Sequence, residues 1–285
     1  MAKIEAVGVL GSGTMGSGII QVLAQNGYEV YYRARRQDSV DGGLETVRKN
    51  LERMVRKERI TQKEMDEAMA RIHGSTEMEI LRGVDLVIES TTEDLEAKKA
   101  LFKELDVLLD SDVILATNTS SLSITEIAYG TSRPEKIIGM HFFNPVPVMK
   151  LVEVIRGLMT SDETNSIILD MSRNLGKTPV EVEEAAGFVV NRILIPMINE
   201  AIGILADGLA SKEDIDEAMK LGANHPMGPL ELGDLIGLDV VLAILNTMYQ
   251  EYADPKYRPH FFLRKMVRAG KLGRKTGEGF YKYNK

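Results

Sequence analysis

The chain has 285 residues, of which 44% are hydrophobic and 27% are charged, so it suits about two globular domains and excludes collagen-like or disordered classes. Thirty-five Lys and Arg against 42 Asp and Glu give a net charge of −7, which disfavours nucleic acid and anionic membranes as partners. There is no Cys, no apolar run of membrane-spanning length and no signal-peptide pattern, so we expect a cytoplasmic protein without thiolate chemistry.

In the first two-thirds of the chain, short β-branched apolar runs alternate with segments whose apolar residues recur every three or four positions. This alternation predicts βαβ units and a doubly wound, mainly parallel sheet in an α/β fold. The predicted strands are Ala6–Leu10, Glu29–Arg33, Asp85–Glu89, Val113–Thr117, Lys136–Met140, Lys150–Ile155 and Thr178–Val182. The predicted helices are Thr14–Asn26, Gly43–Glu58, Thr61–Arg71, Leu95–Leu109, Ile124–Tyr129 and Asp162–Leu175.

Beyond Val182 the strand signals stop, and Gly187 opens a segment that is apolar on nearly all sides. This segment predicts a buried helix, which is either core within one chain or the shared core of a homodimer. Three further helices are predicted. Ser211, with Asp214 three residues later, forms a capping-box-like start for the first, which stops at Gly222, and the others span Asp234–Ala253 and Phe261–Ala269. We therefore expect domains at residues 1–186 and 187–285, the second all-helical.

A glycine-rich turn directly follows the first predicted strand. Gly11, Gly13 and Gly16 form G-x-G-x-x-G between that strand and a helical run, with a second strand following. A dinucleotide site needs a tight turn, a side-chain-free approach for the pyrophosphate and a helix N-terminus facing the anion. We expect this turn, with Thr14 and Met15, to bind a dinucleotide, which makes residues 1–186 a Rossmann-type dinucleotide-binding domain.

The end of the second strand indicates which dinucleotide is preferred. An NAD site normally places Asp or Glu there to accept hydrogen bonds from the ribose, whereas this chain has Ala34 flanked by Arg33, Arg35 and Arg36. Alanine removes the carboxylate that would repel a 2′-phosphate, and guanidinium groups pair with such a phosphate. The pattern predicts NADP(H), with NAD(H) as the weaker alternative; an exposed basic loop is the other interpretation.

One histidine and one glutamate stand where chemistry is expected. His141 ends a predicted strand, at the edge of the sheet where open α/β folds bind ligands. Glu153 lies in a strand that is apolar on both faces, where an unpaired carboxylate is costly. A pair between them would fix the imidazole tautomer and leave its second nitrogen for acid/base work. A backbone hydrogen bond or an edge position facing water are the alternatives for Glu153.

The remaining polar candidates are less specific. Ser120 follows another predicted strand and is expected to donate a hydrogen bond, because no G-x-S-x-G surrounds it; Ser121 or Ser123 would cap the next helix. The histidines lack metal-ligand spacing, so no metal is expected. On the helix Gly43–Glu58, one face carries Lys49, Arg53, Arg56 and Lys57, which is either a solvated surface or a contact for a second anionic ligand.

The sequence resembles the short-chain L-3-hydroxyacyl-CoA dehydrogenases, in particular the bacterial 3-hydroxybutyryl-CoA members, over essentially its whole length. The matching segments are VLGSGTMGSGI, ATNTSSLSITEIA, GMHFFNPVPVMKLVEVI, GKTPVEV, GFVVNRILIPMINEA, LGANHPMGPLELGDLIGLD and GRKTGEGFYKY. The resemblance departs at Ala34, where NAD-using members carry Asp, and at Arg53, which substitutes one cation for another.

The resemblance implies a role for each matched residue. His141 would be the general acid/base, Glu153 its orienting carboxylate, and Ser120 and Asn191 the substrate contacts. The remaining matches divide between the cofactor (Glu93, Lys98 and Asn118) and the phosphates of coenzyme A (Arg53 and Lys57). It also implies a homodimer formed through the helical domain.

The expected reaction is reversible reduction of acetoacetyl-CoA to (S)-3-hydroxybutyryl-CoA with NADP(H). The alternatives are a related dehydrogenase of a non-CoA 3-hydroxy acid or sugar acid, and a non-catalytic nucleotide-binding protein.

Overall fold

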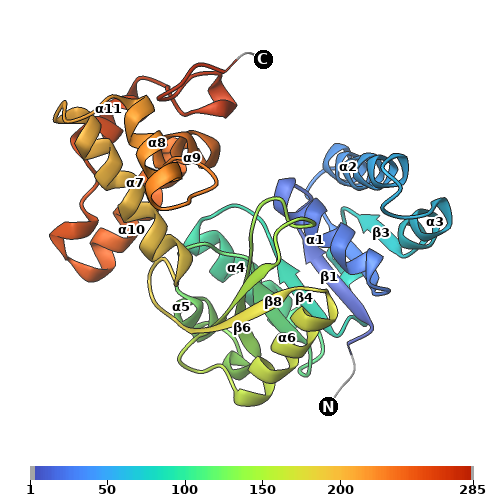
Figure 1. Ribbon diagram of the computed structural model, residues 1–285. Coiled ribbons are helices and arrows are strands. Elements are labelled where there is room, and N and C mark those ends of the chain that lie inside the picture. Colours follow the sequence, from blue (N-terminus) through green and yellow to red (C-terminus); the bar gives the residue numbers. More distant parts are fainter. Residues whose placement is uncertain (1–3, 284–285) are drawn as a thin grey trace. The chain divides into compact units, whose positions relative to one another are not determined.

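The structure, a computed structural model, describes residues 4–283. The chain divides between Ala185 and Ala186 into two compact units (Figure 1). Each unit has its own hydrophobic core.

The first unit is built on one sheet of β1 (Ala6–Leu10), β2 (Glu29–Arg33), β3 (Ile72–Ser75), β4 (Leu86–Glu89), β5 (Ile114–Thr117), β6 (Ile137–Phe142), β7 (Leu151–Arg156) and β8 (Thr178–Glu183). Its strand order is β3-β2-β1-β4-β5-β6-β7-β8, and neighbouring strands are parallel except β6 and β7. The helices are α1 (Thr14–Gln25), α2 (Gln37–Arg56), α3 (Gln62–Ala70), α4 (Leu95–Leu108), α5 (Ile124–Tyr129) and α6 (Asp162–Asn174). The predicted doubly wound, mainly parallel α/β fold is confirmed.

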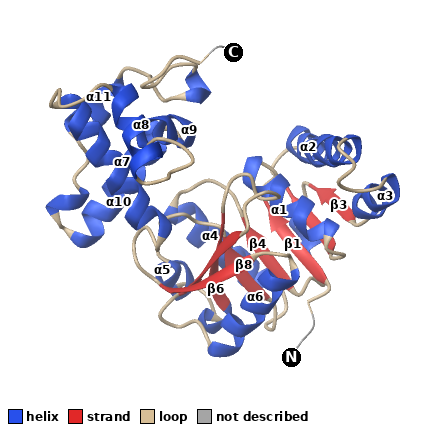
Figure 2. Cartoon of the chain, in the orientation of Figure 1, coloured by secondary structure: helices blue, strands red, loops and turns tan. Residues whose placement is uncertain are grey.

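Helices cover both faces of this sheet (Figure 2). The apolar residues of α1, α2, α3 and α6 share one core with alternate residues of the strands, such as Val7 and Val9 of β1. The intervening strand residues point to the other face, where Ile124 of α5 contacts Gly139 of β6 and Lys98 of α4 bonds Glu89 of β4. The sheet is therefore buried on both sides, which explains why its strands read as continuous apolar runs.

The structure corrects two predictions in this unit. β3 was missed because two of its four residues are exposed and because Gly74 breaks the apolar pattern; a Cβ at Gly74 would lie 2.5 Å from the ring of Tyr32. His73 lies on this strand. Helix α2 begins at Gln37 rather than at Gly43, because Gly43 serves packing within the helix, where a Cβ would lie 2.6 Å from Ser12.

The second unit is helical and contains α7 (Val190–Ala206), α8 (Lys212–Gly222), α9 (Pro229–Ile236), α10 (Leu238–Tyr252) and α11 (Phe261–Arg268). The side chain of Ser211 caps α8 as predicted. Gly222 is the last residue of α8 rather than a left-handed stop, and Asn224 takes the left-handed conformation instead, with φ 56°. The helix predicted at Asp234–Ala253 is two helices, because Gly237, with φ 104°, breaks it.

No single helix among residues 4–283 is long and apolar enough to cross a membrane. Helices α9 and α10 together have the required length and composition, but they are bent by 95°.

Candidate active site

The glycine-rich turn between β1 and α1 has the geometry of an anion cradle. Gly11 has φ 97°, and a Cβ at Gly16 would lie 2.0 Å from the Gly11 carbonyl oxygen. A Cβ at Gly13 would meet nothing within 4 Å, so the backbone is open there to a ligand. The first turn of α1 has no side-chain cap and no acidic residue, so its N–H groups and its dipole favour an anion. These features fit the pyrophosphate of a dinucleotide.

The basic end of β2 lies beside this turn, because the Gly11 N–H donates to the Arg33 carbonyl at 3.0 Å. Ala34 is buried, whereas Arg35 and Arg36 are exposed and form no ion pair within residues 4–283. Arg33 donates through Nε to the Thr76 carbonyl at 3.0 Å, which orients its guanidinium. The sequence-predicted basic residues are therefore gathered next to the turn, two of them available to a ligand.

Four polar side chains share the sheet face that α4 and α5 cover. Glu89 of β4, Thr117 of β5, His141 of β6 and Glu153 of β7 alternate with residues that belong to the core on the opposite face. The first three lie at or near the carboxyl ends of parallel strands, and Glu153 is brought beside His141 by the antiparallel pairing of β7. The edge of the sheet next to the glycine-rich turn thus concentrates ionisable groups in a buried setting.

His141 and Glu153 form a buried pair. They are directly opposite each other in the β6–β7 ladder, and His141 Nδ1 lies 2.8 Å from Glu153 Oε2. The two residues are 7% and 1% exposed, respectively. The ring of Phe143 packs against the imidazole, with centroids 4.5 Å apart. Glu153 therefore does not face water from an edge strand, because β7 is paired on both sides. Its carboxylate engages Nδ1, so proton transfer would use Nε2.

A buried ion pair lies on the same face as the His141–Glu153 pair. Lys98 of α4 donates to both carboxylate oxygens of Glu89, at 2.7 and 2.6 Å, and Thr91 and Thr117 also donate to this carboxylate. Burial disfavours the charged form of Glu89, but the ammonium and the hydroxyl donors outweigh it and lower the pKa of Glu89. Glu89 was not predicted from the sequence, although an acid at the end of an apolar strand is the same signal that identified Glu153.

The Glu89–Lys98 pair predicts a pH-dependent stability. Because its pKa is lower in the folded state, Glu89 stabilises the fold above its unfolded pKa of about 4.3, and this contribution is lost as the pH falls through the folded value. At pH 7, Glu89→Gln removes the counter-ion that Lys98 contacts directly and leaves only Glu93, at 3.8 Å, so it is expected to cost about 3 kcal/mol of unfolding free energy. The difference from wild type should shrink as the pH is lowered below about 4.

Urea unfolding at several pH values measures this difference. Glu96→Gln is the matched control, because Glu96 pairs with Lys99 on the exposed side of the same helix. A loss that is equally large at pH 7 and at pH 3 would contradict the assignment.

Ser120 is held by a glutamate from the neighbouring strand end. The Ser120 N–H and hydroxyl donate to Glu93 Oε1 at 2.8 and 3.0 Å, and the hydroxyl of Thr119 donates to the same oxygen. Lys98 Nζ lies 3.8 Å from Glu93 Oε2. The structure thus brings together three of the residues predicted from the resemblance. The cap of α5 is Ser123, as one alternative had it.

Asn118 ties the ends of three strands together. Its backbone N–H donates to the Glu89 carbonyl at 2.7 Å, its side-chain amide donates to Ser90 Oγ at 3.2 Å, and its Oδ1 accepts from the Phe142 N–H at 2.8 Å. Asn191 belongs to the second unit, where it is buried in the first turn of α7.

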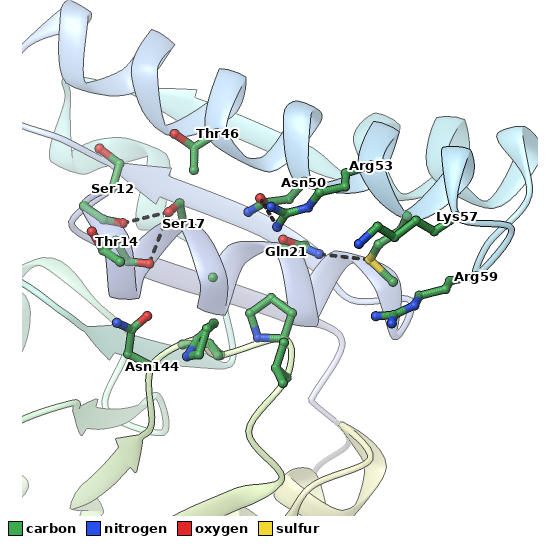
Figure 3. A pocket seen from close by; sticks show the side chains of 17 residues that line it. Ser12, Thr14, Ser17, Gln21, Thr46, Asn50, Arg53, Lys57, Arg59 and Asn144 are labelled. Atoms are coloured by element: carbon green, nitrogen blue, oxygen red, sulfur yellow. Dashed lines mark hydrogen bonds between the residues drawn. The ribbon is translucent and has the colours of Figure 1, made fainter. Parts of the chain in front are cut away.

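A cleft of about 590 Å³ opens beside the glycine-rich turn (Figure 3). One side is formed by Ser12, Gly13 and α1, another by the middle and end of α2, and a third by residues 144–148 of the segment between β6 and β7. Thr14 and Ser17 lie at one end, and Arg53, Lys57 and Arg59 lie at the other. The cleft is long, with one cationic end.

The structure divides the basic face predicted on α2. Arg53 and Lys57 line the cleft, whereas Lys49 and Arg56 do not. Arg59, which was not predicted, joins the cleft because Glu58, with φ 55°, turns the chain back after the helix. The other histidines lie elsewhere, and the described residues contain no group of three or more His, Cys, Asp or Glu side chains placed to hold a metal ion.

Comparison with known families covers both units. Residues 6–185 match the family description "3-hydroxyacyl-CoA dehydrogenase, NAD binding domain", and residues 187–283 match "3-hydroxyacyl-CoA dehydrogenase, C-terminal domain". The first match agrees with the geometry of the glycine-rich turn and indicates a nicotinamide dinucleotide cofactor.

Similar proteins span nearly the whole chain. A protein of Clostridioides difficile named 3-hydroxybutyryl-CoA dehydrogenase is 59% identical over 97% of this chain and 99% of its own length. The human mitochondrial hydroxyacyl-coenzyme A dehydrogenase is 43% identical over 98% of this chain and 91% of its own length. The crystal structure of (S)-3-hydroxybutyryl-CoA dehydrogenase from Ralstonia eutropha superimposes with a TM-score of 0.97 at 52% identity, over 99% of this chain and 100% of that one.

Proposed function

This chain belongs to the 3-hydroxyacyl-CoA dehydrogenase family, and on that basis we propose that it catalyses the reversible reduction of acetoacetyl-CoA to (S)-3-hydroxybutyryl-CoA with NADP(H). The observation that carries the proposal is the buried His141–Glu153 pair at the carboxyl end of β6. The names of the similar proteins support the substrate.

The proposed catalytic and substrate-contacting residues each have a separate role in the reaction. His141 donates a proton from Nε2 to the developing alkoxide at the substrate C3, and in the reverse direction takes it back. Glu153 holds Nδ1–H throughout and stabilises the imidazolium form. With substrate bound, the Ser120 hydroxyl turns its single proton from Glu93 to the same oxygen, while the Ser120 N–H remains bonded to Glu93. Asn191 contacts the acyl part. The bound nicotinamide supplies the hydride.

The preference for NADP(H) rests on the end of β2. Arg35 and Arg36 are exposed, without ion-pair partners within residues 4–283, and next to the glycine-rich turn, and Ala34 places no carboxylate there. Arg36 also precedes the first turn of α2, whose N–H groups add to the positive potential. NAD(H) is the weaker alternative.

The coenzyme A phosphates are proposed to bind at the cationic end of the cleft. In the double variant Arg53→Met with Lys57→Met, we expect KM for acetoacetyl-CoA to rise by about 10–100-fold, because two charge-assisted contacts to phosphate are lost. KM for NADPH should stay unchanged, as should KM for acetoacetyl-pantetheine, which lacks the nucleotide phosphates. Lys49→Met is the matched control, because Lys49 pairs with Glu45 outside the cleft.

Oxidation of NADPH by acetoacetyl-CoA, followed at 340 nm, tests the function as a whole. Saturable turnover that depends on Arg53 and Lys57 supports it. Turnover of 3-hydroxy acids or sugar acids without coenzyme A would favour the related dehydrogenase, and the absence of any turnover would favour a nucleotide-binding protein.

A homodimer through the helical unit is also proposed. One face of α7 packs inside its own unit through Ile195, Ile198 and Ile202, so intrachain core accounts for part of its apolar surface. Ile193 on another face is 69% exposed, and Leu209, Leu221 and Phe261 of the same unit are also exposed, so this unit has apolar surface that a partner could cover. The mass in solution, measured by light scattering, tests this assignment.

A further inference from the structure

A buried lysine with no role in the proposed reaction lies behind one wall of the cleft. Lys177 is 9% exposed, and its ammonium group donates to the backbone carbonyls of Val146 and Met149, the latter at 2.8 Å. Burial lowers the pKa of this amine, which reflects the cost of placing it there. Within residues 4–283, no other side chain donates to a backbone carbonyl of residues 143–149.

The backbone on both sides of Lys177 is fixed. Helix α6 ends in a Schellman motif: Gly176 has φ 68°, its N–H donates to the Arg173 carbonyl, and the Lys177 N–H donates to the Ser172 carbonyl. The next residue, Thr178, donates to the Lys150 carbonyl at 2.7 Å and begins β8. The side chain of Lys177 therefore leaves a rigid corner and reaches under the segment between β6 and β7.

The segment between β6 and β7 has few backbone hydrogen bonds within itself. Pro145 and Pro147 have no N–H groups, and the N–H groups of Val148 and Met149 both donate to the Pro145 carbonyl. On its other side the segment packs against α1, where a Cβ at Gly18 would lie 2.9 Å from the Val146 Cβ. Val146 is thus held from two sides: Lys177 bonds its carbonyl, and Gly18 of α1 packs against its side chain. These two contacts determine how far residues 144–148 lie from α1 across the cleft.

We propose that Lys177 is a positioning residue for the acyl-CoA substrate: it holds residues 144–148 at the distance from α1 that the cleft requires. The inference rests on the proposed function, since it takes the cleft to be the acyl-CoA site. Lys177 acts through the backbone of Val146 and Met149 and does not touch the reacting atoms. The glycine-rich turn is held by separate contacts. Loss of the Lys177 ammonium group should therefore weaken binding of the acyl-CoA substrate and leave dinucleotide binding unchanged.

The variant Lys177→Met keeps the apolar stem and removes the donors. We expect KM for acetoacetyl-CoA to rise by about tenfold or more, because a displacement of about 1 Å in a positioning group can cost about a hundredfold. KM for NADPH and kcat at saturation should change by less than about threefold. Lys177→Arg, which keeps donors and charge, should restore part of the loss. Arg173→Met is the matched control, since it removes an exposed cation from the last turn of the same helix.

Hydrogen–deuterium exchange gives a readout that needs no substrate. In Lys177→Met, the amides of Val148 and Met149 should exchange faster, while those of α1 and β1 stay protected. If Lys177→Met does not fold, Gly18→Ala displaces Val146 from the opposite side and should raise the same KM selectively.

Three other outcomes would contradict either the role of Lys177 or the proposed function. An unchanged KM together with unchanged exchange in the segment would overturn the proposal, and so would an equal weakening of NADPH and acetoacetyl-CoA, which indicates a general structural role. If the wild type does not turn over acetoacetyl-CoA, the proposed function fails, whereas the exchange data still decide whether Lys177 holds the segment.

Discussion

In the variant His141→Gln, kcat for acetoacetyl-CoA reduction is expected to fall by about 10²–10⁴-fold, the usual contribution of a positioned general acid. Glutamine keeps an amide that can donate to Glu153, so the buried carboxylate retains a partner and the fold should survive. It has no proton to give to an alkoxide at neutral pH. The loss should therefore appear in kcat, with NADPH affinity unchanged, when NADPH oxidation is followed at 340 nm under saturating substrate.

Two further variants make this result specific. His73→Gln changes an exposed histidine on the edge strand β3 that pairs with Glu29 of β2, and it should leave kcat unchanged. Glu153→Gln should lower kcat less than His141→Gln, because the imidazole remains but its tautomer is no longer fixed. A His141→Gln enzyme with near-normal kcat would remove His141 from the proposed mechanism.

The parts of the fold that could be predicted from the sequence are those where burial requires a regular pattern of apolar residues. Seven strands were predicted within two residues of their observed ends, because a sheet covered on both faces needs continuous apolar runs. β3 escaped prediction because it is an edge strand with exposed residues and a glycine. The break at Gly237 escaped because an apolar run does not reveal where a helix changes direction.

The candidate site was also only partly predictable from the sequence. Glu153 was identifiable because an acid in an apolar strand needs a partner, and His141 was the polar group at a strand end. Their register, however, depends on β7 running antiparallel to β6, a tertiary feature. Lys177 gave no signal at all, because a lysine after a helix-ending glycine is most often exposed. Only the structure shows the carbonyls that it holds.

The cofactor preference can be reversed at the end of β2. In the variant Ala34→Asp with Arg35→Ile and Arg36→Gln, the ratio of kcat/KM for NADPH to kcat/KM for NADH should fall by about a hundredfold or more. Each charge-assisted contact to a 2′-phosphate is worth about 1.5–3 kcal/mol, or about tenfold or more in kcat/KM. The new carboxylate adds repulsion toward the phosphate and an acceptor for the ribose hydroxyls of NADH.

The triple variant should alter side chains at the end of β2 without moving the backbone there. Ala34 donates its N–H to the Ser75 carbonyl at 3.1 Å, and Arg33 remains tied to Thr76, so the backbone of the β2 end should keep its path. Arg48→Gln is the control, since it removes an exposed cation from the same helix α2 at a distance from the turn. If both the triple variant and wild type show the same cofactor ratio, Arg35 and Arg36 form only a solvated basic loop, and the preference must be set by other residues.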